Sequence, residues 1–301
     1  MSAPTGSARV VAQAKINLFL RIGAREPSGY HQLETLFCRL DLGDVVTVFL
    51  GETERTVVCR GPAMPEGGLG PPEENLAYRA AEAYLQAAEW RTGFRIEIEK
   101  RIPVGGGLGG GSADAAAVLR ALDAMNDEAD ANVSATDIGM TLGSDVPFLL
   151  EDAPLAFAWG RGERMLMLPQ LPKRHIALLV PPFAINTGEA YGWLAALRTG
   201  RTHMPAPRLV PLAALTTWEL LETVADNDFE PVVLGRHPQL RRYTHALEER
   251  GASIALMSGS GSTVFGVFES APDVGELERA TGCRVLLTHN AERVVPVSLL
   301  G

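Results

Sequence analysis

Pro103-Val-Gly-Gly-Gly-Leu-Gly-Gly-Gly-Ser-Ala113 is the most unusual segment of the chain. Six glycines occupy the seven positions from Gly105 to Gly111, and only Leu108 interrupts them. Because such a run costs backbone entropy on folding, it requires a structural reason. The next residues supply one, since Ser112 is a good N-cap and apolar residues at helical spacing predict a helix over 113–125. A glycine loop that opens onto a helix N-terminus directs free N–H groups to one point, and this predicts a phosphate site.

Three other interpretations of the loop are less favoured. A flexible linker is usually polar on both sides, whereas this run lies between a strand pattern and a helix pattern. Gly105, Gly107 and Gly110 also satisfy the G-x-G-x-x-G spacing of dinucleotide-binding loops, which follow a buried strand. Here the preceding segment, 94–100, alternates apolar and charged residues, which is typical of an antiparallel or edge strand. No Gly-Lys-Ser/Thr follows, so the loop is not a Walker A site.

Composition limits the classes of protein that the chain could be. Its 301 residues suit two domains, 46% are hydrophobic, and the net charge is −9, which argues against a nucleic-acid binder. The three cysteines, at positions 38, 59 and 283, are far apart and lack metal-ligand spacing. The N-terminus has no signal-peptide core, and the apolar run 176–185 is too short for a membrane span. We therefore expect a cytoplasmic protein with no membrane and no nucleic-acid partner.

Periodicity predicts mixed strands and helices without strict βαβ alternation, which favours an α+β fold in both halves. In the N-terminal half, we expect strands at 9–22, 44–50, 56–60 (paired with 44–50) and 94–100, and helices at 74–90, 113–125 and 134–143. Ser134-Ala-Thr-Asp137 fits a capping box at the start of the last of these helices. The character changes near Gly160, so two domains are predicted, 1–158 and 159–301. In the second we expect a hairpin over 156–168, strands at 175–180, 254–257, 263–268, 285–287 and 293–297, and helices at 187–198, 212–225, 238–250 and 274–280.

Four residues stand out chemically, and each has a structural alternative. Lys15 lies within an apolar strand, where it is either a lysine reaching to water or a cation held near phosphate. Tyr30 and His31 follow a Pro/Gly turn and could simply be packing residues. Asp145 follows the end of a helix, where it could cap the next turn or present a carboxylate from a loop. The cap and the presented carboxylate are compatible.

These segments together resemble the GHMP kinase superfamily. The glycine loop 103–113 matches its hallmark, and Ser258-Gly-Ser-Gly-Ser262 matches its second glycine motif. Within the superfamily, the resemblance is to the branch that acts on 4-diphosphocytidyl-2-C-methyl-D-erythritol. It is carried by segments spread over almost the whole chain: Ala14-Lys-Ile-Asn-Leu-Phe-Leu20, Gly29-Tyr-His31, Glu34-Thr-Leu-Phe37, the glycine loop, Leu142-Gly-Ser-Asp-Val-Pro147, Asp226-Asn-Asp-Phe-Glu230 and Met257-Ser-Gly-Ser-Gly261.

The resemblance implies a two-domain GHMP kinase fold with an N-terminal ATP-binding domain, a C-terminal substrate-side domain and a cleft between them. It also implies transfer of the γ-phosphoryl group of ATP, with Mg²⁺, to the 2-hydroxyl of this cytidine diphosphate-linked polyol, a step of the non-mevalonate isoprenoid pathway. Asp145 would be the base and Lys15 the adjacent cation. The ATP phosphates would be held by Pro103, Val104, Gly105, Gly106, Gly107, Leu108, Gly109, Gly110, Gly111, Ser112 and Ala113.

On the substrate side, the resemblance implies that Tyr30 stacks on cytosine and that His31 hydrogen-bonds to its edge. Tyr191 is the expected second stacking residue, and Asn17 and Thr187 would also contact substrate. From its position, Thr187 is also predicted to cap the helix at 187–198. The side chain of Asp114 is expected to point away from phosphate. The Mg²⁺ ligands are not predicted, and we expect a monomer or weak homodimer. A kinase for another small alcohol and a non-catalytic nucleotide-binding protein remain as alternatives.

Overall fold

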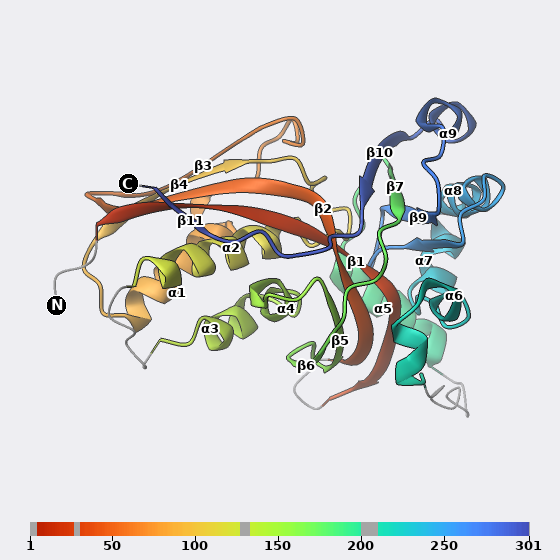
Figure 1. Ribbon diagram of the computed structural model, residues 1–301, viewed down its shortest axis with the longest axis horizontal. Helices are drawn as coiled ribbons and strands as arrows, with labels where there is room; N and C mark the ends of the chain where they lie inside the picture. Colours follow the sequence, from red (N-terminus) through yellow and green to blue (C-terminus); the bar gives the residue numbers. More distant parts are fainter. Residues whose placement is uncertain (1–4, 27–30, 127–132, 200–209, 301) are drawn as a thin grey trace.

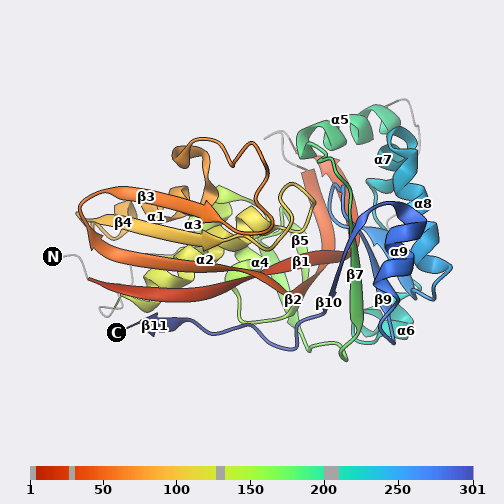
Figure 2. The ribbon, with the colours of Figure 1, turned by 90° about the horizontal axis from the view of Figure 1, so that it is seen from above.

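The computed structural model describes residues 5–26, 31–126, 133–199 and 210–300. Two β-sheets lie next to each other, with helices on one face of the larger sheet and on the outer side of the smaller one (Figures 1 and 2). Strand pairing in the larger sheet is almost entirely antiparallel, and β3 with β4 is the parallel exception. The predicted α+β class is therefore confirmed.

The larger sheet has the strand order β11-β1-β2-β4-β3, and the hairpin β5–β6 pairs with the N-terminal half of β2 through β5. Its strands are β1 (Gly6–Arg25), β2 (His31–Glu52), β3 (Arg55–Arg60), β4 (Gly93–Glu99), β5 (Leu155–Gly160), β6 (Arg164–Leu168) and β11 (Ser298–Leu300). Strands β1 and β2 are long, at 20 and 22 residues, and run from the far edge of the sheet into the junction with the smaller sheet (Figure 1). Their pairing is irregular between Gln13 and Lys15 and again between Asn17 and Phe19. Irregularities of this kind change the direction in which side chains point, and these two flank the segment from Lys15 to Asn17.

Four helices cover the same face of this sheet: α1 (Leu76–Ala87), α2 (Gly110–Ala124), α3 (Ala135–Leu142) and α4 (Val146–Leu150), with a 3₁₀ turn, η1 (Pro72–Glu74), before α1. Helix α2 lies innermost and packs on α1, β1 and β2. Its small residues, Ala115, Ala116, Ala117 and Ala121, are almost fully buried and allow this close packing. The N-terminal end of α2 is therefore rigidly placed.

The smaller sheet is antiparallel, in the order β10-β7-β9-β8. Its strands are β7 (His175–Val180), β8 (Ile254–Met257), β9 (Val264–Phe268) and β10 (Arg284–His289). The surrounding helices are α5 (Thr187–Arg198), α6 (Trp218–Leu221), α7 (Glu230–Arg236), α8 (Pro238–Glu248) and α9 (Val274–Thr281), with a 3₁₀ turn, η2 (Leu212–Leu215). A second core, which includes Leu179, Phe229, Leu247 and Val264, lies between this sheet and its helices.

The predicted pairing of 56–60 with 44–50 is wrong, because β4 lies between β3 and β2. Gly93 makes this arrangement possible. A Cβ at Gly93 would lie 2.3 Å from the Glu54 carbonyl oxygen. The adjacent Phe94 N–H donates to that same oxygen at 2.9 Å. Strand β4 thus enters the sheet beside the chain that leaves β2.

Two predictions near the C-terminus are also corrected. The last strand is 298–300 rather than 293–297, because backbone groups of 293–295 bond to side chains instead of to a strand. The side chain of Gln13 bonds to Arg293 O and Val295 N, and Arg120 donates to Val295 O. The helix expected over 212–225 is split into η2 and α6, and the Thr217 side chain caps α6.

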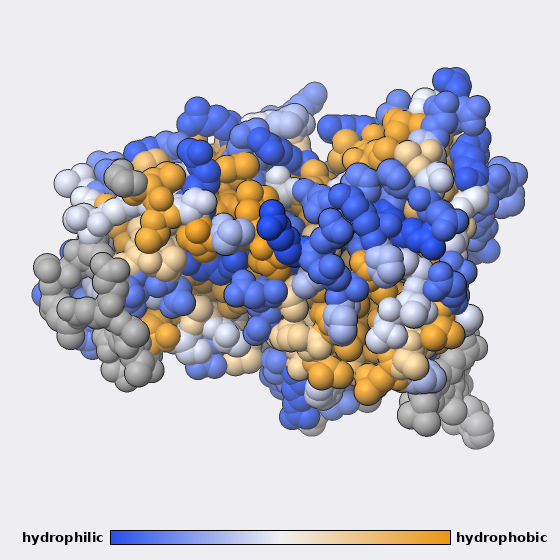
Figure 3. All heavy atoms as spheres, in the orientation of Figure 1, coloured by the Kyte–Doolittle hydropathy of each residue, from blue (hydrophilic) through white to orange (hydrophobic). Residues whose placement is uncertain are grey.

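The division into domains at residues 158 and 159 stays a prediction. Strand β5 spans that position, and β11 returns to the first sheet from the C-terminal end of the chain. Hydrophilic residues cover the middle of one face, in front of the junction of the two sheets, and apolar groups show below them (Figure 3). No helix among the described residues is long and apolar enough to cross a membrane.

Candidate active site

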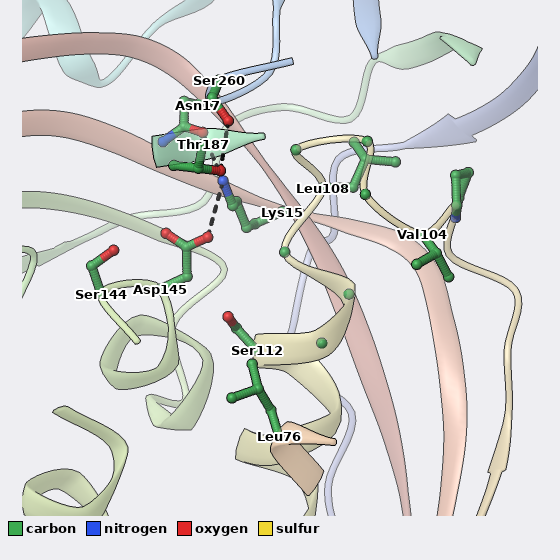
Figure 4. Close-up of a pocket in the computed structure, with 18 of the residues that line it drawn as sticks. Lys15, Asn17, Leu76, Val104, Leu108, Ser112, Ser144, Asp145, Thr187 and Ser260 are labelled. Atoms are coloured by element: carbon green, nitrogen blue, oxygen red, sulfur yellow. Dashed lines mark hydrogen bonds and ion pairs between the residues drawn. The ribbon is translucent and has the colours of Figure 1, made fainter. Parts of the chain in front are cut away.

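A cavity of about 510 Å³ lies where the glycine loop, the middle of β1 and the start of α4 meet (Figure 4). Most of the predicted site residues line it: Lys15, Asn17, Pro103, Val104, Gly105, Gly106, Gly107, Leu108, Gly109, Gly110, Gly111, Ser112, Asp145, Thr187 and Tyr191. Ala113 does not line it and is buried in the first turn of α2. His31 lines an adjoining cavity, and Tyr30 lies outside the described residues.

Lys15 is turned into this cavity rather than towards bulk water. Its side chain is 4% exposed, and its ammonium lies 3.3 Å from Asp145 Oδ2 and donates to Asn17 Oδ1 at 2.8 Å. The backbone N–H of Lys15 donates to Leu108 O at 3.0 Å, so β1 is tied directly to the glycine loop. Because a buried ammonium needs partners, this arrangement favours the interpretation of Lys15 as a held cation.

The orientation of Asn17 is set by a short hydrogen-bond chain. Its amide Nδ2 donates to Thr35 Oγ1 at 2.8 Å, and Thr35 donates to Phe19 O at 2.7 Å. The Asn17 side-chain oxygen is thereby directed at Lys15. Thr35 is fully buried and lines the cavity. Thr35 belongs to the segment Glu34-Thr-Leu-Phe37 that carries the resemblance, but the sequence showed no role for it because its partners lie on another strand.

Asp145 occupies the cap position of α4, yet its side chain caps nothing. Its carboxylate faces Lys15 instead (Figure 4). Gly109 makes room for this pair, since a Cβ there would lie 3.1 Å from Lys15 Cε and 3.6 Å from Asp145 Oδ2. A carboxylate on a short loop and a buried ammonium therefore meet directly beside the glycine loop.

The glycine loop leads into α2 earlier than predicted. The helix begins at Gly110 and its N-cap is Gly109, in the left-handed conformation with φ 72°, so Ser112 is not the cap. Gly110, Gly111 and Ser112 line the cavity, and they belong to the first helical turn, whose N–H groups lack helical partners. This geometry suits an anion.

The second glycine motif packs against the first. Ser258 Oγ donates to Gly107 O at 2.9 Å, and Thr263 N donates to Gly106 O at 3.1 Å. Asn227, which is fully buried, holds the second motif by donating to Met257 O at 2.7 Å and to Gly259 O at 2.8 Å. The sequence placed Asn227 in a matching segment without a role, because its partners lie about 30 residues away.

Thr187 contributes to the cavity but does not cap α5. Asn186 is the cap, since its Oδ1 accepts from Glu189 N at 3.2 Å. The Thr187 hydroxyl lies 2.9 Å from the Ser260 hydroxyl, and both residues line the cavity (Figure 4). The predicted cap is therefore corrected by one residue, and the Thr187 hydroxyl is left available at the cavity.

A second cavity of about 450 Å³ adjoins the first and shares Leu33, Ser144 and Tyr191 with it. The rings of His31 and Tyr191 stack here, with centroids 4.7 Å apart, and Tyr191 also meets Phe229 edge-on. Burial, together with nearby Arg25 and Arg198, lowers the pKa of His31, so its ring is neutral at neutral pH. Burial and Asp145 raise the pKa of Tyr191 to about 12. Both rings are thus uncharged, as a stacking surface for a base requires.

Glu230 supports the second glycine motif by accepting from Met257 N at 2.8 Å. Burial raises its pKa from 4.5 to about 7, so the folded state holds the proton more tightly than the unfolded chain. The stabilisation that comes from protonated Glu230 is fully present below pH 4.5 and is lost as the pH rises through about 7.

We expect Glu230→Gln, which stays neutral, to raise the free energy of unfolding by roughly 2 kcal/mol at pH 8. It should add little near pH 5. Urea unfolding at both pH values tests this, and an equal effect at both would contradict it.

Comparison with known proteins agrees with this geometry. Residues 75–151 match the family "GHMP kinases N terminal domain", and residues 209–284 match "GHMP kinases C terminal". A 4-diphosphocytidyl-2-C-methyl-D-erythritol kinase from Anaeromyxobacter sp. (strain Fw109-5) is 44% identical over 87% of this chain and 82% of the relative. The chain belongs to the 4-diphosphocytidyl-2-C-methyl-D-erythritol kinase family. A kinase of that name from Desulfitobacterium hafniense (strain Y51) is 37% identical over 94% of this chain and 95% of the relative.

Solved structures place the fold in the same family. A crystal structure of 4-(cytidine 5'-diphospho)-2C-methyl-D-erythritol kinase superposes with a TM-score of 0.70 and 34% identity, covering 94% of this chain and 99% of that one. Homoserine kinase from Cytophaga hutchinsonii has a TM-score of 0.68 at 16% identity, covering 98% of each chain, and shares the fold. The predicted two-domain GHMP kinase fold and the kinase class are therefore confirmed.

Proposed function

We propose that this kinase transfers the γ-phosphoryl group of ATP to the 2-hydroxyl of 4-diphosphocytidyl-2-C-methyl-D-erythritol, in the non-mevalonate isoprenoid pathway. The names of its relatives point to this substrate. The observation that carries the proposal is the position of Lys15 and Asp145, 3.3 Å apart in the first cavity, beside its junction with the second. The glycine loop contacts this pair through Gly109, and Tyr191, which stacks on His31, lines the same cavity.

ATP would occupy the larger cavity. Its phosphates would lie against the N–H groups of residues 105–112 and the N-terminus of α2. Beyond the loop the cavity continues to Leu69, Asn75 and Leu76, which form a partly apolar end suited to the adenosine part of the nucleotide. This arrangement directs the γ-phosphate towards Lys15 and Asp145.

Asp145 would orient the attacking hydroxyl and accept its proton. The new O–P bond would form as the bond from the γ-phosphorus to the β–γ bridging oxygen breaks and ADP leaves. Lys15 would stabilise charge on the transferred group, because its ammonium is buried and already fixed by Asn17. Phosphoryl transfer depends mainly on such positioning and charge stabilisation. The presence of both groups favours a kinase over a non-catalytic nucleotide-binding protein.

Mg²⁺ would enter with the triphosphate. No three His, Cys, Asp or Glu side chains gather into a metal site among the described residues. Mg²⁺ prefers phosphate oxygens and water as ligands, so we expect the triphosphate itself to supply ligands for the ion. When bound, the ion would offset phosphate charge, and the residues of the loop would position the phosphates themselves.

The cytidine end of the acceptor would occupy the smaller cavity. Tyr191 would stack on the base, and His31 would hydrogen-bond to the edge of the base. Tyr30, which is not among the described residues, is proposed as the other stacking residue. Asn17, which accepts a hydrogen bond from Lys15, and Thr187, which lines the same cavity, would contact the polyol nearer the reacting hydroxyl. His31 covers one face of Tyr191 in this structure, so the base would displace the His31 ring.

The direct test is ADP release by the purified protein with ATP and Mg²⁺, with and without 4-diphosphocytidyl-2-C-methyl-D-erythritol. We expect release to depend on this substrate and not on mevalonate or homoserine. Release on another small alcohol alone would move the assignment to a different acceptor. ATP binding without release on any alcohol would favour a binding protein. A cytoplasmic location and a monomeric or weakly dimeric state belong to the same proposal.

Tyr191→Ala should raise the KM for the cytidine-linked substrate about tenfold or more, because one base stack contributes about 1–3 kcal/mol. The KM for ATP should change little. Tyr191→Phe is the matched control, since it keeps the ring and removes only the hydroxyl, and it should retain a KM for that substrate close to that of the unmodified enzyme. Equal KM values for the alanine variant and the unmodified enzyme would remove Tyr191 from the substrate site.

A further inference from the structure

A buried cluster of three charged side chains lies at the base of the glycine loop, outside the Lys15–Asp145 pair. The Lys100 ammonium, 3% exposed, donates to Asp44 and, at 2.6 Å, to Asp114 Oδ2. Lys100 directly follows β4, Asp44 lies in β2, and Asp114 lies in the first turns of α2. One ammonium therefore joins the strand before the loop to the helix after it.

The two carboxyl groups have very different surroundings. Asp44 accepts from the Lys100 ammonium and from the backbone N–H groups of Arg101 and Ile102, at 2.5 and 2.8 Å. Asp114 accepts from Lys100 alone, and its Oδ1 is buried with no hydrogen-bond partner among the described residues. A buried oxygen without a hydrogen-bond partner raises the free energy of the ionised carboxylate. Of the two carboxyl groups, Asp114 is therefore the one expected to hold a proton.

The cluster also touches the nucleotide cavity. Lys100 and Asp114 both line it, together with Gly110 and Gly111. A Cβ at Gly110 would lie 3.7 Å from the Lys100 nitrogen, which shows how closely the ammonium approaches the start of α2. With Asp114 protonated, Asp44 and Lys100 cancel and the cluster is neutral. Without that proton, it carries one negative charge beside the site of the triphosphate.

We propose that Asp114 is a positioning residue that carries a proton when ATP binds, keeping the Lys100 cluster neutral and the first turn of α2 attractive to phosphate. Loss of that proton to solvent weakens ATP binding. This inference rests on ATP binding at the glycine loop, as proposed above. The expectation that Asp114 points away from phosphate is met only in part, because its Oδ2 is turned to Lys100 while the residue still lines the cavity.

Electrostatics agrees with this geometry. Burial raises the pKa of Asp114 to about 8, opposed by Lys100 and assisted by Asp44. Burial by itself would lower the pKa of Lys100, but its contacts with Asp114 and Asp44 outweigh this effect and raise that pKa. The charged and titratable groups that face Asp114 are Lys100 after β4, Asp44 of β2 and the Cys59 thiol of β3, whose own pKa burial raises.

The test is the pH dependence of the KM for ATP from pH 6.5 to 9.5. For the unmodified enzyme we expect a KM that is constant up to about pH 7.5 and then rises roughly three- to tenfold, because one added charge near the phosphates is repulsive. Asp114→Asn resembles the protonated acid, so its KM should stay flat across the range. Asp152→Asn removes a carboxyl that is 89% exposed and should keep the rise.

The outcomes of this experiment distinguish the role of Asp114 from the proposed function of the protein. A flat KM in the unmodified enzyme, or an unchanged rise in Asp114→Asn, overturns the role of Asp114 and leaves ATP binding intact. Absence of any ATP turnover or binding overturns the proposed function instead. If Asp114→Asn does not fold, ¹³Cγ-aspartate NMR of the unmodified protein decides. A carboxyl that titrates above pH 7 and responds to ATP supports the proposal, whereas titration of every aspartate below pH 6 rejects it.

Discussion

Asp145→Asn is expected to lower kcat by about 10²–10⁴-fold, the usual contribution of a positioned base, and to leave ATP affinity within a few-fold. The side chain caps no helix, so its loss removes little local structure. Its carboxylate faces Lys15 at 3.3 Å, and an amide at that position can neither accept the proton of the hydroxyl nor neutralise the ammonium. Single-turnover kinetics and ATP titration measure the two quantities separately.

A double substitution sharpens this experiment. If Asp145 and Lys15 act as one unit, the combination of Asp145→Asn with Lys15→Met should be scarcely slower than the worse single variant. Multiplicative losses would show that the two residues act independently. Near-normal turnover of Asp145→Asn by itself would remove this carboxylate from the mechanism.

Gly107→Ala is expected to damage both ATP binding and folding. Gly107 has φ 79°, and a Cβ there would lie 2.2 Å from Ser258 O and 3.1 Å from Gly261 O. These are backbone atoms of the second glycine motif, so they cannot rotate away as a side chain would. We expect a destabilisation of about 3 kcal/mol or more and at least a tenfold rise in the KM for ATP.

Gly235→Ala is the matched control, because Gly235 lies in α7 and a Cβ there meets nothing within 4 Å. This variant should be as stable as the unmodified protein or slightly more stable. Thermal unfolding and ATP titration of the two variants compare the sites. A Gly107→Ala variant with normal stability and normal ATP affinity would show that the two glycine motifs do not pack as closely as the structure has them.

Helices, strands and caps were predicted correctly where they depend only on residues close together in the sequence. The hairpin β5–β6, the strand β7 and the Ser134 cap of α3 were read from neighbouring residues and are confirmed. Predictions failed where a distant partner decided the outcome. Strand β3 pairs with β4 because Gly93 admits it, and 293–297 bonds to Gln13 and Arg120 rather than to a strand.

The sequence by itself determined the glycine loop, its helix, the α+β class and the residue types of a kinase site, because each depends on local spacing or on a motif. The family resemblance already implied that Lys15 lies beside Asp145. Only the tertiary structure decided which other groups meet. The contacts of Asn227 with the second glycine motif and the cluster of Asp44, Lys100 and Asp114 came only from the structure, because they join segments far apart in the chain. Hydrogen bonds and ion pairs act over a few ångströms, and the fold alone brings such segments within that range.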